Sequence, residues 1–515
     1  MAMAEVLTFA TPSAESARSA ATWSDARVAA VVGSASAAVA LAGSWIPSLW
    51  GDEAASIMSA QRDWPSLFAM LGTVDAVHGL YYALLHFWID LVGISPFALR
   101  LPSGLAIGTA AAGLYLLVRT SAGCWIAVVA AAVFTVLPRV AQVAVEARPT
   151  PFAVALAVWL TLLMLRLVDG RARGAWWWGY AVGLAVGTYL FLYVILLVPV
   201  HVVAVVAWTL DRRKREIRTP RIRSFLLAWS CAVVLAVPIC VIAVLQRRQV
   251  AFRGRQPAVT LETVLVAPWF MLPMLAFAGW ALIAIGVAAA AVHRHDPSWR
   301  GRTRLLVLSA AWAVIPAAAL LLVTAFATPV YTARYLVLTA PAAAIAISVG
   351  VSVLPWRRSH VIAAALIAAL ALPAIVDQRL PYAKNFGTDW QTVSAVVAEH
   401  SVVGDGIVFD ESVRPSRRPR LAMYTYPEGF HGLVDLALVR SHDETDGLWD
   451  VTAPLSAVDH RLEGVDRVLV VLRSRRGADP DVAVLREHGF VLTAVHPIES
   501  SRVAVYERDA AGTRD

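Results

Sequence analysis

Long apolar runs separated by short polar stretches make up most of the first 376 residues of the chain. A helix needs about 20 mostly apolar residues to cross a membrane, so each run of that length predicts a membrane-spanning helix. The clear runs are 29–47, 100–118, 122–138, 150–168, 224–245, 264–292, 305–326, 335–354 and 360–376. The stretch 176–210 is too long for one crossing, and we expect two short spans that meet near Thr188–Tyr193.

The composition of the chain supports the same fold class. Its 515 residues are 59% hydrophobic and 16% charged, whereas soluble domains are about 45–50% apolar and about 25% charged. We therefore predict a polytopic α-helical membrane protein. The formal net charge of +8 is interpreted as a sign of topology, because basic residues collect in cytoplasmic loops, and not as a sign of nucleic-acid binding.

Loop charge gives the expected orientation in the membrane. The strongly basic loops are 211–223, 293–304 and 356–359, with a fourth at 171–173. All four fall on one side only if the short segment 79–93 does not cross completely. By the positive-inside rule that side is cytoplasmic. The prediction is about eleven spans, with the N-terminus inside and the C-terminus outside.

Three parts of the chain follow from this topology. Residues 1–28 form a cytoplasmic segment, and 29–376 form the transmembrane domain, in which 48–98 is a large external loop with interfacial helices. From residue 377 the pattern changes: "GDGIVFD", "RVLVVLR" and "FVLTAVHPI" predict short buried strands, and 479–489 predicts a helix between two of them. Residues 377–515 are therefore expected to be an external α/β domain.

Two features near the start and within the spans have plain interpretations. The first apolar run follows acidic residues and no clear basic segment, so it predicts a first transmembrane helix and not a signal peptide. The cysteines lie in apolar runs without CxxC or Cys/His spacing. We expect them to be buried small hydrophobes, with no disulfide and no zinc site: Cys124, Cys231 and Cys240.

Four polar clusters fall on the predicted external face: 52–78, 139–149, 246–256 and 327–335. In the first, Asp52 and Glu53 stand side by side directly after an apolar run. Adjacent residues on a helix point in different directions, so they do not form a matched acid and base pair. One carboxylate is enough to take a proton from an attacking hydroxyl. The alternative is that "GDEA" begins a helix and the carboxylates cap it.

Each of the other clusters also has a structural alternative. Glu146 and Arg148 would alone be interpreted as an interfacial salt bridge. The segment "QRRQVAFRGR" places four arginines on the external side, which indicates an anionic ligand or a solvated loop beside anionic headgroups. Arg334 lies at the mouth of a span. The isolated His78 and His201 are each expected to be satisfied or interfacial histidines.

Together the clusters predict an external cavity at membrane level, with carboxylates on one wall and arginines on the other. A carboxylate can activate a hydroxyl, and guanidinium groups can hold a phosphate. This combination indicates sugar transfer from a lipid phosphate.

The elements "GDEA", "HGLYYALLHFW", "ALRLPSGLA", "EARPTPFAVAL" and "YTARYLVLTAPA", in this order, resemble the GT-C superfamily of integral membrane glycosyltransferases. The resemblance is to the branch that holds protein O-mannosyltransferases, aminoarabinose transferases of lipid A, and actinobacterial envelope mannosyl- and arabinofuranosyltransferases. It covers roughly residues 28–376.

The resemblance implies roles for individual residues. Asp52 matches the acidic residue regarded as the catalytic base. The residues expected to bind substrate are Glu53, His78, Glu146, Arg148, Gln246, Arg247, Gln249, Tyr331, Arg334 and Tyr335. No metal ligand is implied, no cofactor is fixed, and a divalent metal is left open.

The expected function is that of an inverting glycosyltransferase on the outer face of the plasma membrane. It would move mannose from a polyprenyl-phosphate donor to an envelope glycan or glycolipid. Arabinofuranose is the second expected sugar. A transporter of lipid-linked intermediates and a non-catalytic assembly protein are the alternatives; a transporter would more typically carry charges deep within its spans. The expected partners are the donor, the acceptor and membrane lipid, with no nucleic acid.

Overall fold

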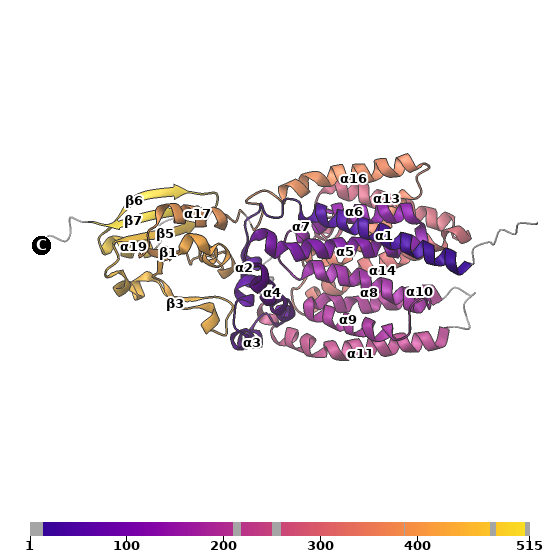
Figure 1. The fold of residues 1–515 in the computed structure, drawn as a ribbon, viewed down its shortest axis with the longest axis horizontal. Coiled ribbons are helices and arrows are strands. Elements are labelled where there is room, and N and C mark those ends of the chain that lie inside the picture. Colours follow the sequence, from indigo (N-terminus) through magenta and orange to yellow (C-terminus); the bar gives the residue numbers. More distant parts are fainter. Residues whose placement is uncertain (1–13, 210–217, 250–258, 386, 474–479, 510–515) are drawn as a thin grey trace, which may run out of the picture.

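The computed structural model describes residues 14–209, 218–249, 259–385, 387–473 and 480–509. Figure 1 shows a long bundle of helices with a domain of strands and short helices attached at one end. The predicted polytopic helical fold with a C-terminal domain that contains a sheet is confirmed. Parts of the basic loop 211–223 and of the arginine segment 246–256 lie outside the described residues, as does the start of the chain.

The main helices of the bundle are α1 (Ala14–Leu41), α5 (Pro96–Ala122), α6 (Cys124–Val136), α7 (Pro138–Ala144), α8 (Thr150–Val168), α9 (Trp176–Leu190), α10 (Leu197–Thr209), α11 (Arg218–Leu245), α13 (Pro273–Val292), α14 (Arg300–Phe326), α15 (Ala340–Val351) and α16 (Arg357–Asp377). Short helices join or extend them: η2 (Leu192–Leu196), α12 (Leu261–Leu265), η5 (Pro297–Trp299) and η6 (Ala333–Thr339).

The described residues contain eight helices that are long and apolar enough to cross a membrane, or nine if the bent pair α6 and α7 is one span. These two helices meet at 64°, because Pro138 has no N–H to continue the helix and disfavours helical backbone at the preceding residue. Residues 176–209 form α9 and α10 with a break at Phe191, within the predicted range Thr188–Tyr193; neither helix is among the eight that are long enough to cross. A count of eleven spans remains a prediction.

Small residues let the helices pack closely. A side chain at Gly108 of α5 would lie 2.6 Å from the carbonyl oxygen of Gly33 in α1. At Gly350 of α15 it would lie 1.9 Å from the carbonyl oxygen of Leu282 in α13. Backbone approach of this kind is the usual way in which helices associate inside membranes.

The bundle has two different ends. The C-terminal domain and α2 (Gly51–Ala60), α3 (Trp64–Thr73), η1 (Ala76–His78) and α4 (Gly79–Val92) lie at one end, and α1 begins at the other (Figure 1). At that far end Asp25 pairs with Arg119 at 3.0 Å, and Gly301 lies against the backbone of Ser121. The basic loop 293–304 is therefore at the end opposite the C-terminal domain, as the topology prediction requires.

The C-terminal domain contains helices α17 (Trp390–His400), α18 (Ala422–Thr425) and α19 (Pro480–Glu487), and strands β1 (Gly406–Phe409), β2 (Val434–Asp435), β3 (Leu438–Arg440), β4 (Val451–Thr452), β5 (Arg467–Arg473), β6 (Phe490–Pro497) and β7 (Ser501–Arg508). Its 3-10 turns are η7 (Pro415–Arg417), η8 (Pro419–Leu421), η9 (Pro427–Phe430), η10 (His442–Glu444), η11 (Leu455–Ala457) and η12 (Asp459–Leu462).

The main sheet has the order β2-β1-β5-β7-β6, with β1 parallel to β2 and β5, and β7 antiparallel to β5 and β6. The predicted strands β1, β5 and β6 and the helix α19 are all present. The prediction that β6 is buried is wrong: only Phe490 in it is buried, because β6 is an edge strand. β7 was not predicted.

Alternate residues of the central strands face two hydrophobic cores, as the period of a strand requires. Val468 and Val470 of β5 pack in a core that includes residues of α19. Leu469 and Val471 pack in a second core with α17, which also contains residues of α2, α3 and α4. The C-terminal domain and the helices at the end of the bundle thus share one core and form a continuous structure.

Other expectations concern isolated side chains. The prediction of buried cysteines is wrong: Cys124 is exposed and Cys231 and Cys240 are partly exposed. Cys124 begins α6 in a tight turn at the end of the bundle, and Cys231 and Cys240 lie on α11, whose apolar window is only 28% buried within the chain. His201 is buried and satisfied, since it is hydrogen-bonded to Tyr180 and Thr161.

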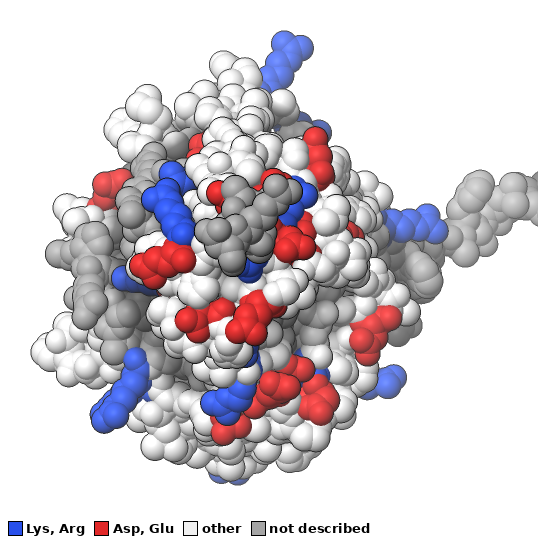
Figure 2. Space-filling model, turned by 90° about the vertical axis from the view of Figure 1, so that its left-hand side faces the viewer, with Lys and Arg blue, Asp and Glu red and all other residues white. Residues whose placement is uncertain are grey.

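The outer face of the C-terminal domain carries acidic and basic side chains interspersed among uncharged ones (Figure 2). The net charge of +8 therefore does not form a continuous basic surface at this end. This distribution agrees with the interpretation of the charge as a topology signal.

Candidate functional site

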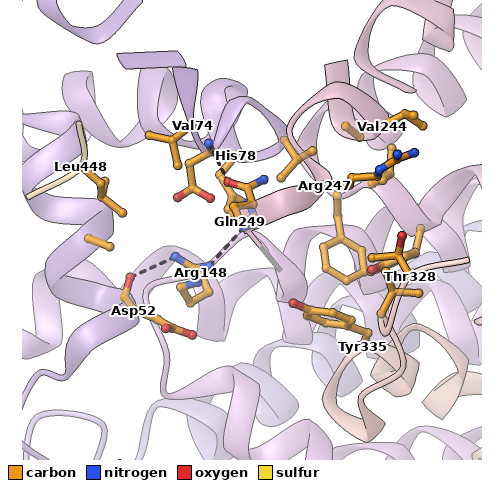
Figure 3. Close-up of a pocket in the computed structure, with 18 of the residues that line it drawn as sticks. Asp52, Val74, His78, Arg148, Val244, Arg247, Gln249, Thr328, Tyr335 and Leu448 are labelled. Atoms are coloured by element: carbon orange, nitrogen blue, oxygen red, sulfur yellow. Dashed lines mark hydrogen bonds between the residues drawn. The ribbon is translucent and has the colours of Figure 1, made fainter. Parts of the chain in front are cut away.

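A cavity of about 1370 Å³ lies where the bundle meets the C-terminal domain. Its walls come from α2, η1, the loop before α8, η2, the ends of α11 and α14, η6, and the loops 414–416 and 446–449. Figure 3 shows Asp52 and Leu448 on one side of this cavity, and Arg247, Val244, Thr328 and Tyr335 on the other.

Asp52 lies in the first turn of α2 and lines the cavity. Its Oδ2 accepts a hydrogen bond from Nη2 of Arg334 at 2.5 Å, and its side chain is 31% exposed. Burial raises the pKa of this carboxyl, but the charges of Arg334 and Arg148 outweigh burial and lower the pKa to about 2. Trp50 is the N-cap of α2, and no side chain caps the helix. The expected helix start is confirmed, but Asp52 is not its N-cap residue; it lies in the first turn of α2.

Glu53 points away from the cavity, as the rotation between neighbouring helical residues requires. Its carboxylate is completely buried and accepts two hydrogen bonds from Arg100, at 2.8 Å and 2.7 Å. The backbone N–H of Ala147 donates a third at 2.9 Å. Glu53 does not line the cavity, so the structure gives it a supporting position and does not bring it to the expected substrate site.

Arg148 connects three parts of the site. Its Nη1 donates to the backbone oxygen of Asp52 at 2.9 Å and to Oγ of Ser56 at 3.0 Å. Its Nη2 lies 3.3 Å from Nε2 of His78. Burial lowers the pKa of Arg148, but Asp52 and the neighbouring acidic groups together outweigh burial, and the pKa is raised. Arg148 therefore remains a cation at the cavity wall.

His78 lines the cavity beside Arg148. Burial lowers its pKa to about 4, although the charge of Asp75 acts in the opposite direction. At neutral pH the imidazole is uncharged, so Nε2 accepts the hydrogen bond from Arg148 and Nδ1 carries the proton. That Nδ1 is buried and has no partner among the described residues.

Arg334 and Tyr335 enter the cavity from η6. The guanidinium of Arg334 lies 5.4 Å from the ring centre of Trp50, in addition to its ion pair with Asp52. The ring of Tyr335 packs against Tyr193 at 5.0 Å and against Phe191 at 5.9 Å. These aromatic rings fix the wall from which Arg334 reaches the carboxylate.

The end of α11 contributes both lining and supporting residues. Arg247 and Gln249 line the cavity. Gln249 accepts a hydrogen bond from the backbone N–H of Asp75 at 3.0 Å. Gln246 does not line the cavity; it bridges α3 and η1 by bonding the Leu71 oxygen and the Ala76 N–H. No hydrogen bond or ion pair of Arg247 occurs within the described part of the chain.

Two further expected residues lie outside the cavity. Glu146 is buried and pairs with Lys384 at 3.3 Å, which ties the segment after α16 to the loop before α8. Tyr331 is buried and donates to the backbone oxygen of Thr263 at 2.8 Å. Both side chains therefore support the walls from behind.

The expected residues thus separate into two groups. Those that line the cavity are Asp52, His78, Arg148, Arg247, Gln249, Arg334 and Tyr335. Those that support it from outside are Glu53, Glu146, Gln246 and Tyr331.

Several lining residues were missed by the sequence analysis: Asp75, Phe191, Tyr193, Arg414, Ser416, Asp446 and Trp449. Asp75 has a local signal, because it is an acidic residue three positions before His78, within the polar cluster 52–78. The residues of the C-terminal domain have no such signal, because their place beside α2 depends on contacts between distant segments.

Among the described residues, the side chains do not form a ready-made site for a divalent metal ion. The described residues contain no group of three or more His, Cys, Asp or Glu side chains that could hold one. Oδ2 of Asp52 is already paired with Arg334. The chemistry of the site is therefore derived from its carboxylate and guanidinium groups.

Comparisons with known proteins agree with this architecture. The family model described as dolichyl-phosphate-mannose-protein mannosyltransferase matches residues 80–244. No curated protein matches the chain significantly. ArnT from Cupriavidus metallidurans bound to undecaprenyl phosphate is similar in structure, with a TM-score of 0.56, 13% identity, and coverage of 93% of this chain and 98% of ArnT. Apo ArnT gives a TM-score of 0.55, 13% identity, and coverage of 96% and 99%.

A third solved structure that matches the chain is that of arabinofuranosyltransferase AftD from Mycobacteria. Its TM-score is 0.47 at 16% identity, and the match covers 93% of this chain and 41% of AftD. The match to ArnT extends over nearly the whole of both chains and includes the bundle and the C-terminal domain. The chain therefore has the fold of ArnT.

Proposed function

We propose that the protein is an inverting glycosyltransferase that moves a sugar from a polyprenyl-phosphate donor to a hydroxyl acceptor in this cavity. The observation that carries the proposal is the set of charged groups on the cavity wall: one carboxylate, Asp52, with the guanidinium groups of Arg148, Arg247 and Arg334. ArnT, which has the same fold, was solved with undecaprenyl phosphate bound.

The reaction is one displacement at the anomeric carbon. The acceptor oxygen attacks, its proton passes to Asp52, and the bond between the anomeric carbon and the phosphate oxygen breaks. The phosphate begins as a diester with one negative charge and leaves as a monoester that gains a second. Guanidinium groups near the phosphate stabilise the charge that develops during this step, so they lower the barrier.

Donor binding would also activate the base. Without a donor, Arg334 pairs with Asp52, and this pair lowers the pKa of the carboxyl to about 2, which makes it a poor proton acceptor. A phosphate beside Arg334 would share its charge and hydrogen bonds, so the carboxylate would lose part of its stabilisation and its pKa would rise. The ion pair would thus keep the base inactive until the donor is in place.

The lipid part of the donor would bind in the apolar half of the cavity. The cavity wall near Arg247 contains Ala243, Val244, Leu320 and Val323 from α11 and α14. An isoprenoid chain placed there would be removed from polar surroundings, while its phosphate lay at the level of the arginines. This arrangement agrees with a carrier that enters sideways from the membrane.

Mannose is the sugar that we propose, because the matching family model is described as a dolichyl-phosphate-mannose-protein mannosyltransferase. By the positive-inside rule, the end with the C-terminal domain would lie outside the plasma membrane. The acceptor would then be an envelope glycan or glycolipid.

The test uses the purified protein in lipid nanodiscs with radiolabelled polyprenyl-phosphate-mannose, polyprenyl-phosphate-arabinofuranose and candidate acceptors. We expect transfer of mannose with inversion at the anomeric carbon, and activity that a chelator does not remove. Transfer of arabinofuranose alone would contradict mannose as the transferred sugar. Absence of transfer from both donors to every acceptor would contradict the proposed glycosyl transfer.

A further inference from the structure

A loop of the C-terminal domain is held over the cavity by buried polar contacts. Arg62, between α2 and α3, has only 1% of its surface exposed. Its Nη1 donates to the backbone oxygen of Thr445 at 2.8 Å and to Oγ of Ser66 at 3.0 Å, and its Nη2 donates to the backbone oxygen of Gly447 at 2.5 Å. Charged donors to buried carbonyl groups give strong, oriented hydrogen bonds.

Two side chains of α3 add to this contact. Oγ of Ser66 donates to the backbone oxygen of Asp443 at 2.5 Å, and Oγ1 of Thr73 donates to the backbone oxygen of Asp446. We call Arg62, Ser66 and Thr73 the clasp. All of its contacts to the loop are with backbone oxygens, so the side chains of the loop remain available for other partners.

Residues of the loop that the clasp holds line the cavity. Asp446, Leu448 and Trp449 line it, and on the neighbouring segment so does Asp75. Asp75 is two residues beyond Thr73; its carboxylate accepts a hydrogen bond from the hydroxyl of Tyr82 at 2.5 Å, and its backbone N–H donates to Gln249 at 3.0 Å. Leu448 lies on the side of Asp52 and across the cavity from Arg247 (Figure 3). This region therefore carries two carboxylates, Asp75 and Asp446, and one indole.

This wall has the chemistry of a site for an uncharged sugar. Carboxylates accept hydrogen bonds from hydroxyl groups through several lone pairs. The indole of Trp449 offers a flat apolar face and one N–H donor, which suits the C–H face of a sugar ring. An acceptor that carries phosphate groups would meet the repulsion of Asp75 and Asp446.

We propose that the loop held by the clasp, together with Asp75, is the acceptor subsite, and that it binds an uncharged glycan. The proposal rests on the proposed function. An inverting displacement needs the acceptor on the face of the sugar opposite the leaving phosphate. With the phosphate held between Arg334 and Arg247, the acceptor arrives from the wall that carries Leu448, where Asp52 can take its proton.

The test compares Trp449→Ala and Trp449→Phe with the wild type in nanodiscs, using neutral manno- and arabino-oligosaccharides as acceptors. We expect Trp449→Ala to raise the acceptor KM by about 10-fold, with kcat and the affinity for undecaprenyl phosphate unchanged. Trp449→Phe should restore most of the affinity. Arg62→Lys, which keeps the charge but loses the two-carbonyl fork, should also raise the acceptor KM. Trp356→Ala, at a tryptophan that is 72% exposed, is the matched control.

Direct binding separates this inference from the proposed function. Saturation-transfer NMR with the same oligosaccharides needs no donor and no turnover. Binding that is lost in Trp449→Ala supports the subsite even if no transfer occurs with any donor. An unchanged acceptor KM in Trp449→Ala, an equal loss of donor affinity, or tighter binding of phosphorylated than of neutral glycans would overturn the proposal.

Discussion

At the scale of single residues, two adjacent carboxylates have different environments. Asp52 faces the cavity and is partly exposed, whereas Glu53 is completely buried between Arg100 and the Ala147 N–H. The sequence alone predicts that they point in different directions, because they follow one another on a helix. It does not reveal which partner each one finds, since Arg100 is 47 residues away from Glu53.

Glu53→Gln tests the supporting role of Glu53. The substitution leaves Arg100 buried without its counter-charge, so the folded protein should lose roughly 3–5 kcal/mol of stability. Thermal unfolding in detergent measures this loss. Asp90→Asn is the control, because Asp90 is 71% exposed and pairs only weakly with His86. A Glu53→Gln variant as stable as Asp90→Asn would show that the pair does not hold the site together.

The lowered pKa of His78 predicts that the stability of the folded protein depends on pH. Its pKa in the folded protein is about 4, below the ordinary value near 6.5 of a free imidazole. As the pH falls, the unfolded chain takes up the proton first. The contribution of neutral His78 is therefore complete above about pH 6.5 and is lost as the pH falls toward 4. His78→Asn should show a smaller drop in melting temperature between pH 7 and pH 4.5 than the wild type, and an equal drop would contradict the assignment.

At the scale of elements, α2 is the piece that joins the two halves of the molecule. Its first residue, Gly51, lies against the loop 415–416: a side chain there would come within 2.0 Å of the backbone oxygen of Ser416. Leu49, just before α2, donates its N–H to the hydroxyl of Tyr426. The position of Asp52 is therefore set jointly by the bundle and by the C-terminal domain.

Gly51→Ala should loosen the contact between α2 and the C-terminal domain. Because the backbone of Ser416 cannot move aside without shifting its turn, we expect faster proteolysis of the C-terminal domain and a loss of transfer activity of at least about 10-fold. Gly72→Ala in α3 is the matched control, since a side chain there meets nothing within 4 Å. If the two variants behave alike, the contact between α2 and the C-terminal domain is not important.

Most elements could be predicted from the sequence, and the reason lies in local periodicity. Apolar runs of spanning length gave the long helices, and strand-like runs gave β1 and β5, which are buried on both faces. Burial of β6 was predicted wrongly because its apolar run does not reveal an edge position. The contacts of the clasp could not be predicted, since Arg62 and Thr445 are 383 residues apart.

At the scale of the whole molecule, the two ends of the bundle differ in chemistry. The cavity and the C-terminal domain lie at one end, and the loop 293–304 with Arg119 lies at the other. The function that we propose needs the cavity end to face outside, where the donor and the acceptor would be. The positive-inside rule gives the same orientation, because it places the basic end in the cytoplasm.

Reporter fusions test this orientation. Alkaline phosphatase attached after residue 376 should be active, because that position lies in the last turn of α16, at the cavity end. The same reporter within the loop 293–304 should be silent. The reverse pattern would contradict both the orientation and the assignment of an external donor.

The most direct test of the account is the turnover of Asp52→Asn. The substitution keeps the size of the side chain and removes the basic oxygen, while Arg148, Arg247 and Arg334 remain in place to hold the donor. With purified protein, a polyprenyl-phosphate sugar and an acceptor, we expect kcat to fall by roughly 100- to 10,000-fold, with the affinity for undecaprenyl phosphate and the melting temperature largely retained. Turnover close to that of the wild type would show that Asp52 is not the base.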